Sequence, residues 1–179
     1  MKLHLGCGKR NFGSDWIHVD PADFDHVSHK DVELKVFENN VADLIYSSHL
    51  FTYFDRQEAV RVLENWHRVL KPGGILRIAV PNFKRLAIMY TRNNSIGLDA
   101  LLGPLFGRWP INNNTVYMKT TYDFESLKKL LEDCKFKNVK EYNWRETEHA
   151  QFDDHSQAYI PHMDKEKGTL ISLNVECKK

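Results

Sequence analysis

The chain has 179 residues, 42% hydrophobic and 27% charged, a composition that predicts one soluble domain over residues 1–179. Lys and Arg number 25 against 24 Asp and Glu, so no overall field favours a nucleic-acid partner, and no apolar run approaches the ~18 residues of a membrane helix. Met1 leads into KLHLG without an apolar leader, and the three cysteines lie far apart, so we expect a reduced, cytoplasmic protein.

Short apolar runs bounded by turn residues predict the strands of a parallel sheet. They are KLHLG at 2–6, WIHVD at 16–20, ADLIYSS at 42–48 and ILRIAV at 75–80, and a weaker strand is expected around Val27. Strands that are buried on both faces have this continuous apolar pattern.

The clearest predicted helix lies between the last two of these runs. Asp55 with Glu58 three residues later predicts a capping box, and Pro72-Gly73-Gly74 ends the helix. One face of this helix is apolar at the spacing of helical turns, and it carries Ala59, Val62, Leu63, Trp66, Val69 and Leu70.

A second helix is expected from Asp123, and strands follow it at 139–144 and 169–177. The last strand alternates, with Ile171, Leu173, Val175 and Cys177 against Leu170, Ser172, Asn174 and Glu176. The whole pattern predicts an α/β fold: a Rossmann-like, mostly parallel sheet of about seven strands, with an antiparallel strand near the C-terminus and helices on both faces. Only ten residues separate Leu5 from Trp16, so the first crossover is expected to be shortened to one helical turn or none.

Gly6-Cys7-Gly8 ends the first strand, and Asp20 ends the second. Glycine lets a ligand approach the backbone, and Asp20 at the neighbouring strand end would accept hydrogen bonds from ribose hydroxyls. A dinucleotide fits less well, because Asn11 replaces the third glycine of its fingerprint and no helix N-terminus is expected for the pyrophosphate. A cofactor without phosphates needs no such helix.

Four stretches resemble the class I S-adenosylmethionine-dependent methyltransferases, in this order and spacing: LHLGCG, WIHVD, VADLIYSSHL and WHRVLKPGGILRIAVPNF. The chain is most similar to a compact group related to the type 11 family, and TYDFESLKKLLEDCKFKNVKEY and SLNVECKK extend the likeness over nearly its whole length. The resemblance implies S-adenosylmethionine as cofactor. It places the cofactor against the glycine loop of Gly6, Cys7 and Gly8. It makes Asp20 the ribose-binding acid and Asp31 the acid that faces adenine. The stretch after the fourth strand, Ser47, Ser48 and His49, would line the cofactor.

The sequence departs from this group directly after that stretch. Relatives commonly have Leu-Glu-His, and this chain has Leu50-Phe51-Thr52-Tyr53. No role of the missing glutamate or histidine is therefore transferred.

Methyl transfer to a hydroxyl requires removal of a proton, and three residues are candidates for that role. His49 is a candidate by its position at a strand end, and Asp154 and His155 because a carboxylate beside an imidazole can orient it. An unperturbed histidine titrates near pH ~6.5, so a rate limited by its deprotonation would rise there. The alternatives stay open that His49 only contacts the cofactor and that residues 154–155 lie in a solvated loop.

The long loop at 146–168 is also rich in oxygen and nitrogen ligands. The spacing of these residues matches no known metal motif, so we expect no metal. The residues are Glu148, His149, Asp153, Asp154, His155, His162 and Asp164.

Residues 93–122 form a second long irregular segment. Because no helices precede the first strand, this segment is expected to cover the cofactor and select the substrate, with Arg108 for an anionic group and apolar faces from Leu105, Phe106, Trp109 and Tyr117. The alternative is that it packs against a second subunit in a homodimer.

Three functions remain open. The first is methyl transfer to a small-molecule or saccharide-like acceptor. The group that the chain resembles often accompanies cell-surface polysaccharide synthesis, and the saccharide is an implication of that resemblance. The second is a non-catalytic S-adenosylmethionine-binding or scaffold protein. The third is an RNA methyltransferase. The eight Lys and Arg residues between positions 56 and 92 favour this function, but no interleaving of aromatic and basic residues supports it.

Overall fold

A computed structural model describes residues 1–92 and 96–179 and contains a seven-stranded sheet of order β3-β2-β1-β4-β5-β11-β8. Strands β1 to β5 pair with one another in parallel, and β11 is antiparallel to both β5 and β8. The predicted fold class, mostly parallel with an antiparallel strand near the C-terminus, is confirmed. The strands are β1 Lys2–Leu5, β2 Trp16–Val19, β3 Val27–His29, β4 Ala42–Ser48, β5 Leu70–Pro81, β8 Lys137–Glu141 and β11 Ser172–Lys178.

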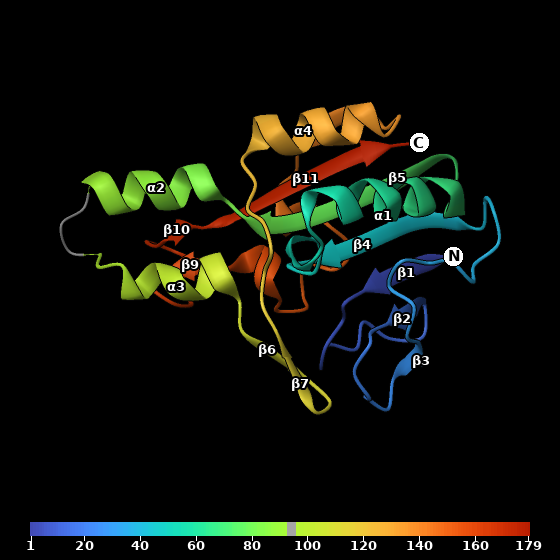
Figure 1. Cartoon of the computed structure of the whole chain (residues 1–179), viewed down its shortest axis with the longest axis horizontal. Coiled ribbons are helices and arrows are strands. Elements are labelled where there is room, and N and C mark those ends of the chain that lie inside the picture. Colours follow the sequence, from blue (N-terminus) through green and yellow to red (C-terminus); the bar gives the residue numbers. More distant parts are fainter. Residues whose placement is uncertain (93–95) are drawn as a thin grey trace.

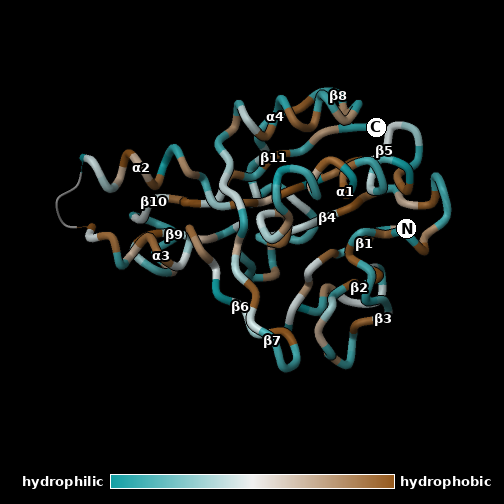
Figure 2. The backbone as a smooth tube through the Cα atoms, in the orientation of Figure 1, coloured by the Kyte–Doolittle hydropathy of each residue, from teal (hydrophilic) through white to brown (hydrophobic). Residues whose placement is uncertain are grey.

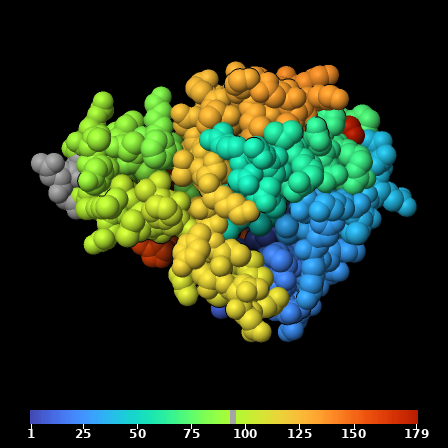
Figure 3. All heavy atoms as spheres, viewed as in Figure 1, coloured from blue at the N-terminus to red at the C-terminus, as the bar shows by residue number. Residues whose placement is uncertain are grey.

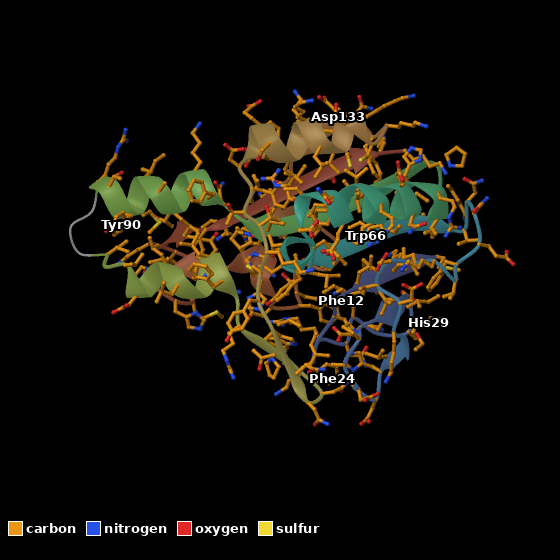
Figure 4. The ribbon with its side chains drawn as sticks, in the orientation of Figure 1. Phe12, Phe24, His29, Trp66, Tyr90 and Asp133 are labelled. Atoms are coloured by element: carbon orange, nitrogen blue, oxygen red, sulfur yellow. The ribbon has the colours of Figure 1, made fainter. Side chains whose placement is uncertain are left out.

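Helices α1 (Arg56–Val69) and α4 (Phe124–Asp133) cover one face of this sheet (Figure 1). Asp55 and Glu58 form the predicted capping box of α1. Trp66 lies between α1 and the sheet (Figure 4), where its indole N–H donates to the Val32 carbonyl at 2.9 Å. The buried face of α1 is the predicted one, and it packs on the core: Ala59, Val62, Leu63, Trp66 and Val69.

Strand β11 shows the predicted alternation. Leu173, Val175 and Cys177 belong to the core beneath the helices, whereas Ser172 and Asn174 are buried on the other side of the strand. The tube in Figure 2 accordingly changes between apolar and polar colours along the sheet. The polar side of β11 therefore faces away from α1 and α4.

The second face of the sheet is covered differently from the prediction. Loops cover it, with the short 3-10 helices η2 (Trp144–Glu146) and η3 (His155–Gln157) in place of α-helices. The reason is that the first crossover, Gly6 to Asp15, contains only turns and irregular backbone. The predicted shortening is therefore confirmed, and the crossover has no helix to cover β1 and β2. Apolar side chains from the loops and strands, most of them aromatic, form a separate cluster there: Phe12, Trp16, Leu44, Tyr46 and Phe152.

Helices α2 (Phe83–Arg92) and α3 (Asp99–Phe106) project beyond the sheet, and α3 is mostly apolar in Figure 2. A hairpin of β6 (Trp109–Ile111) and β7 (Asn114–Val116) follows them. Of the predicted covering segment 93–122, residues 93–95 lie outside the described residues. In the long loop at 146–168 and just beyond it, β9 (Tyr159–Ile160) pairs with β10 (Thr169–Leu170).

Among residues 1–92 and 96–179, none of the helices combines the length and the apolar content that crossing a membrane requires.

Candidate functional site

The carboxyl ends of β1 and β2 bring Gly8 and Asp20 together. Leu5 pairs with Val19 in adjacent parallel strands. The Gly8 N–H donates to Asp20 Oδ2 at 2.8 Å, and the Ala22 N–H donates to Oδ1 at 2.8 Å. The Asp20 residue is only 5% exposed. Because each carboxylate oxygen can accept more than one hydrogen bond, both retain capacity for ligand hydroxyls.

The two glycines of the loop have different roles in the structure. Both have left-handed backbones, with φ of 66° at Gly6 and 55° at Gly8. A Cβ at Gly6 would lie 2.8 Å from Leu50 Cβ, whereas the nearest atom to a Cβ at Gly8 is on Trp109, 3.9 Å away. Gly6 is therefore needed for packing against the end of β4, and the Gly8 side of the loop is the less crowded one.

Cys7 is buried between these glycines, with its Sγ 3.6 Å from His26 Nε2. Burial and the nearby Asp20 carboxylate raise the pKa of the Cys7 thiol to about 12. The thiol is therefore neutral near pH 7 and lines the loop without acting as a nucleophile.

Ser47 and Ser48, at the end of β4, are both buried and lie on opposite faces of the strand. Thr52 follows in the 3-10 helix η1 (Phe51–Tyr53). Within the described residues, none of these three hydroxyls has a hydrogen-bond partner. An unpaired buried hydroxyl costs about 1–3 kcal/mol. Such groups beside a strand end fit a polar ligand that would pair with them.

Asp31 lies at the carboxyl end of β3, as predicted. Its carboxylate accepts hydrogen bonds from the amides of Glu33, Lys35 and Val36, at 3.1, 2.6 and 3.2 Å. Asp31 therefore holds the turn after β3, and its contact with adenine stays a prediction.

His49 and His155, which are far apart in the sequence, lie against each other. Their ring centroids are 5.1 Å apart at an interplanar angle of 25°. His49 follows β4 with a φ of 53°, and its backbone N–H donates to the Ala79 carbonyl at 2.8 Å. Burial, the neighbouring His155 and the Arg10 guanidinium hold the pKa of His49 well below its usual range. Its imidazole is therefore neutral at pH 7.

Asp154 does not orient His155 as the sequence predicted. Its carboxylate points inward, where it accepts hydrogen bonds from the Tyr46 hydroxyl and, at 2.7 Å, from the Ser156 N–H. The second bond caps η3, which leaves the His155 ring on the outer side, exposed at the surface. Desolvation by surrounding protein atoms and the Arg10 charge nevertheless lower the pKa of His155.

Arg10, Ser172 and Asn174 are site residues that sequence reasoning missed. Arg10 stands two residues after the glycine loop, and its Nε donates to the Asp153 carbonyl at 2.7 Å, which ties this loop to the histidine pair. Ser172 lies 3.2 Å from His49 Nε2 and next to Asn174 on the polar side of β11. The alternation of polar and apolar residues along β11 was visible in the sequence, but the proximity of Ser172 to His49 depends on the strand order.

The hairpin of β6 and β7 lies against the glycine loop through Trp109. The Tyr53 hydroxyl donates to the Gly107 carbonyl, and the Lys119 N–H donates to the Thr52 carbonyl at 2.8 Å. In Figure 3 the yellow hairpin accordingly lies beside blue atoms of the N-terminal strands. The predicted covering segment thus reaches the carboxyl edge of the sheet.

Two surface hollows lie at the opposite edge, by the amino end of β5. One, of about 240 Å³, is lined by Ile75, Asn138, Lys140, Glu176, Cys177 and Lys178. The other, of about 540 Å³, is lined by His67, Pro72, Lys135, Lys137 and Lys179. Neither contains a predicted site residue. Over residues 1–92 and 96–179, no three His, Cys, Asp or Glu side chains are grouped so that they could hold a metal ion.

Comparisons with known proteins bear on both the sequence and the fold. Residues 7–78 match the family described as "Methyltransferase domain". No curated protein matches the chain significantly.

Among solved structures, an S-adenosylmethionine-dependent methyltransferase from Archaeoglobus fulgidus is 18% identical with a TM-score of 0.57, covering 99% of this chain and 85% of that one. One from Methanosarcina mazei is 17% identical with a TM-score of 0.59, covering 99% and 91%. The 1,6-didemethyltoxoflavin-N1-methyltransferase of Burkholderia thailandensis, solved with that compound and S-adenosylhomocysteine, is 13% identical with a TM-score of 0.57, covering 99% and 70%. These similarities establish the shared fold.

Proposed function

We propose that the protein is an S-adenosylmethionine-dependent methyltransferase that methylates a hydroxyl of a small-molecule or saccharide-like acceptor. Residues 7–78 match a methyltransferase-domain family, and the fold is shared with S-adenosylmethionine-dependent methyltransferases. The observation that carries the proposal is the pair formed by Gly8 and Asp20 at the ends of β1 and β2. Parallel sheets bind ligands at such strand ends.

The residues present fit S-adenosylmethionine. Asp20 offers a fixed carboxylate for the two ribose hydroxyls, and Gly8 leaves space beside it. Ser48 and Thr52 add unpaired hydroxyls for the polar groups of the methionine part. When bound, the cofactor supplies a methyl group on a positively charged sulfur, so the protein mainly has to align the acceptor and remove its proton.

The properties of His49 support it as the base that takes this proton. It is neutral, it lies at the end of β4, and its backbone is held by the hydrogen bond to Ala79. His155 stacks on it and shares the same surroundings. Because Asp154 is bonded to Tyr46, His155 lacks the orienting carboxylate that the sequence predicted for it, and we assign the role to His49.

A small acceptor agrees with the surroundings of the site. The related enzyme from Burkholderia thailandensis acts on a small molecule, 1,6-didemethyltoxoflavin. Arg10, beside the histidine pair, supplies a positive charge for an anionic group such as a carboxylate on the acceptor.

A turnover screen with a labelled methyl donor tests this function. Pools of saccharides, small hydroxy acids and RNA are incubated with the wild type and with His49→Gln and His155→Gln variants. We expect label in a saccharide or hydroxy-acid product and a loss of ~10²-fold or more in turnover for His49→Gln at unchanged cofactor affinity. A larger loss of turnover in His155→Gln than in His49→Gln would identify His155, in the long loop, as the base. Label in RNA alone, or cofactor binding without turnover in any pool, would contradict the proposal.

A further inference from the structure

We propose that Ser172 and Asn174 are positioning residues that fix the tautomer of His49, so that its Nδ1 is the atom that accepts the proton of the methyl acceptor. This inference rests on the proposed role of His49 as a base. It assigns functions to two residues of β11, a strand in which the sequence predicted no site residue.

Three hydrogen bonds form a chain from the histidine to the backbone of η3. His49 Nε2 lies 3.2 Å from Ser172 Oγ. Ser172 Oγ lies 2.9 Å from Asn174 Oδ1, and Asn174 Nδ2 donates to the Ser156 carbonyl at 2.9 Å. Ser172 and Asn174 are each only 3% exposed, so bulk water does not compete for these bonds.

The carbonyl at the end of the chain determines the direction of every bond in it. A carbonyl oxygen only accepts, so the Asn174 amide must present its NH2 group to Ser156 and its oxygen to Ser172. That oxygen also only accepts, so the Ser172 hydroxyl must donate to it. With its one hydrogen used, Ser172 Oγ can only accept from His49, and Nε2 must therefore carry a hydrogen.

A neutral imidazole has one N–H and one bare nitrogen, so this chain leaves the lone pair on Nδ1. The reverse tautomer would direct the Ser172 hydroxyl to Nε2 and place the Ser172 and Asn174 oxygens 2.9 Å apart without a hydrogen between them. Such a contact is repulsive, and it would leave two buried acceptors unpaired.

The same arrangement suits the proton transfer. The acceptor O–H bond breaks as its oxygen takes the methyl group, the electron pair of the methyl–sulfur bond stays on sulfur, and the proton moves to Nδ1. The resulting imidazolium has hydrogens on both nitrogens, so its bond to Ser172 keeps the same direction and the chain does not rearrange. The proton then leaves to solvent.

Nitrogen NMR of the cofactor-free protein tests the tautomer without any turnover. With 15N-labelled histidine at pH 7.5, the wild type is expected to show a protonated Nε2 and an unprotonated Nδ1 for His49, assigned by comparison with His49→Gln. In Ser172→Ala we expect signals of exchanging tautomers. A wild-type His49 protonated at Nδ1, or an unchanged spectrum in Ser172→Ala, would overturn the inference even if the protein is an active methyltransferase.

Kinetics provide the second readout. Ser172→Ala is expected to lower turnover about 10-fold with unchanged cofactor affinity, as loss of an orienting partner does, and Ser172→Thr, which keeps the hydroxyl, should restore most of it. Ser28→Ala is the matched control, because Ser28 donates to a carbonyl at the other edge of the same sheet. Equal losses in the Ala and Thr variants would point to packing and contradict the positioning role. If no variant or wild type turns over, the NMR result still decides the tautomer, and the proposed function fails separately.

Discussion

Asp20 connects the ends of the first two strands through its bond to the Gly8 amide, and its bond to the Ala22 amide holds the turn after β2. Its remaining acceptor capacity is the part of the site most directly tied to a ribose. We expect Asp20→Ala to weaken S-adenosylhomocysteine binding by about 1.5 to 3 kcal/mol, the scale of hydrogen bonds to a charged group.

Calorimetric titration measures this loss, and circular dichroism checks that the variant is folded. Asp15→Ala, at an exposed position of the first crossover, is the control. Unchanged affinity in folded Asp20→Ala would remove the ribose assignment, and tighter binding of NADH than of S-adenosylhomocysteine would favour a dinucleotide instead.

The histidine pair also changes the expected pH dependence of turnover. A free histidine would give a rate increase near pH ~6.5, but in the structure desolvation by surrounding protein atoms and neighbouring charges lower the pKa of both His49 and His155. The neutral form of the base therefore persists to lower pH. We expect kcat to stay level from pH 8 down past 6.5 and to fall only at more acidic pH, and a midpoint at or above 6.5 would contradict the assignment.

His149 provides a pH test of stability on the second face of the sheet. It is 1% exposed, its ring centroid lies 4.0 Å from that of Tyr46, and burial lowers its pKa to about 4. Between pH 6.5 and 4 the unfolded chain binds this proton and the folded chain does not, so stability falls as the pH falls below 6.5. Urea unfolding should show the wild type losing on the order of 2 kcal/mol more than His149→Phe between pH 7.5 and 5.

The control for this experiment is His162→Gln, a replacement of a histidine at an exposed position. Equal losses of stability in the wild type and His149→Phe would show that the buried imidazole does not limit acid stability.

At the scale of elements, the hairpin of β6 and β7 is expected to act in acceptor binding, because Trp109 faces Gly8 and the segment is bonded to η1. The double variant Phe106→Ser/Trp109→Ser should keep the sedimentation mass of the wild type and lose acceptor affinity about 10-fold or more, equivalent to about 1.4 kcal/mol. Val60→Ser, at an exposed position on α1, is the control. Dissociation of a dimer in the double variant would assign the segment to a subunit interface instead.

Elements with strong local signals were predictable from the sequence. The α1 helix has its capping box and apolar face in one continuous stretch, and β11 has a regular alternation. The position of Asp154 was not predictable, because its partner Tyr46 lies 108 residues away on β4 and the cap of η3 depends on a fold formed at a distance. The approach of Ser172 to His49 likewise depends on β11 lying next to β5.

For the whole molecule, the short first crossover is the main departure from a sheet with α-helices on both faces. The ten residues between Leu5 and Trp16 predicted it, but not what replaces the helix. The replacement is the long loop carrying η2 and η3, which packs aromatic and histidine side chains on the sheet through Phe152 and His149. This loop also delivers His155 to the carboxyl edge, so one segment both completes the core and borders the site.

A crystal structure of the protein with S-adenosylhomocysteine would show whether the carboxyl ends of β1 and β2 hold S-adenosylmethionine. We predict both ribose hydroxyls within hydrogen-bond distance of the Asp20 carboxylate, with the ligand passing beside Gly8 and its sulfur directed toward His49. A ligand bound at the basic hollow lined by His67 and Lys179, or one that leaves Asp20 bonded only to the Gly8 and Ala22 amides, would contradict the account.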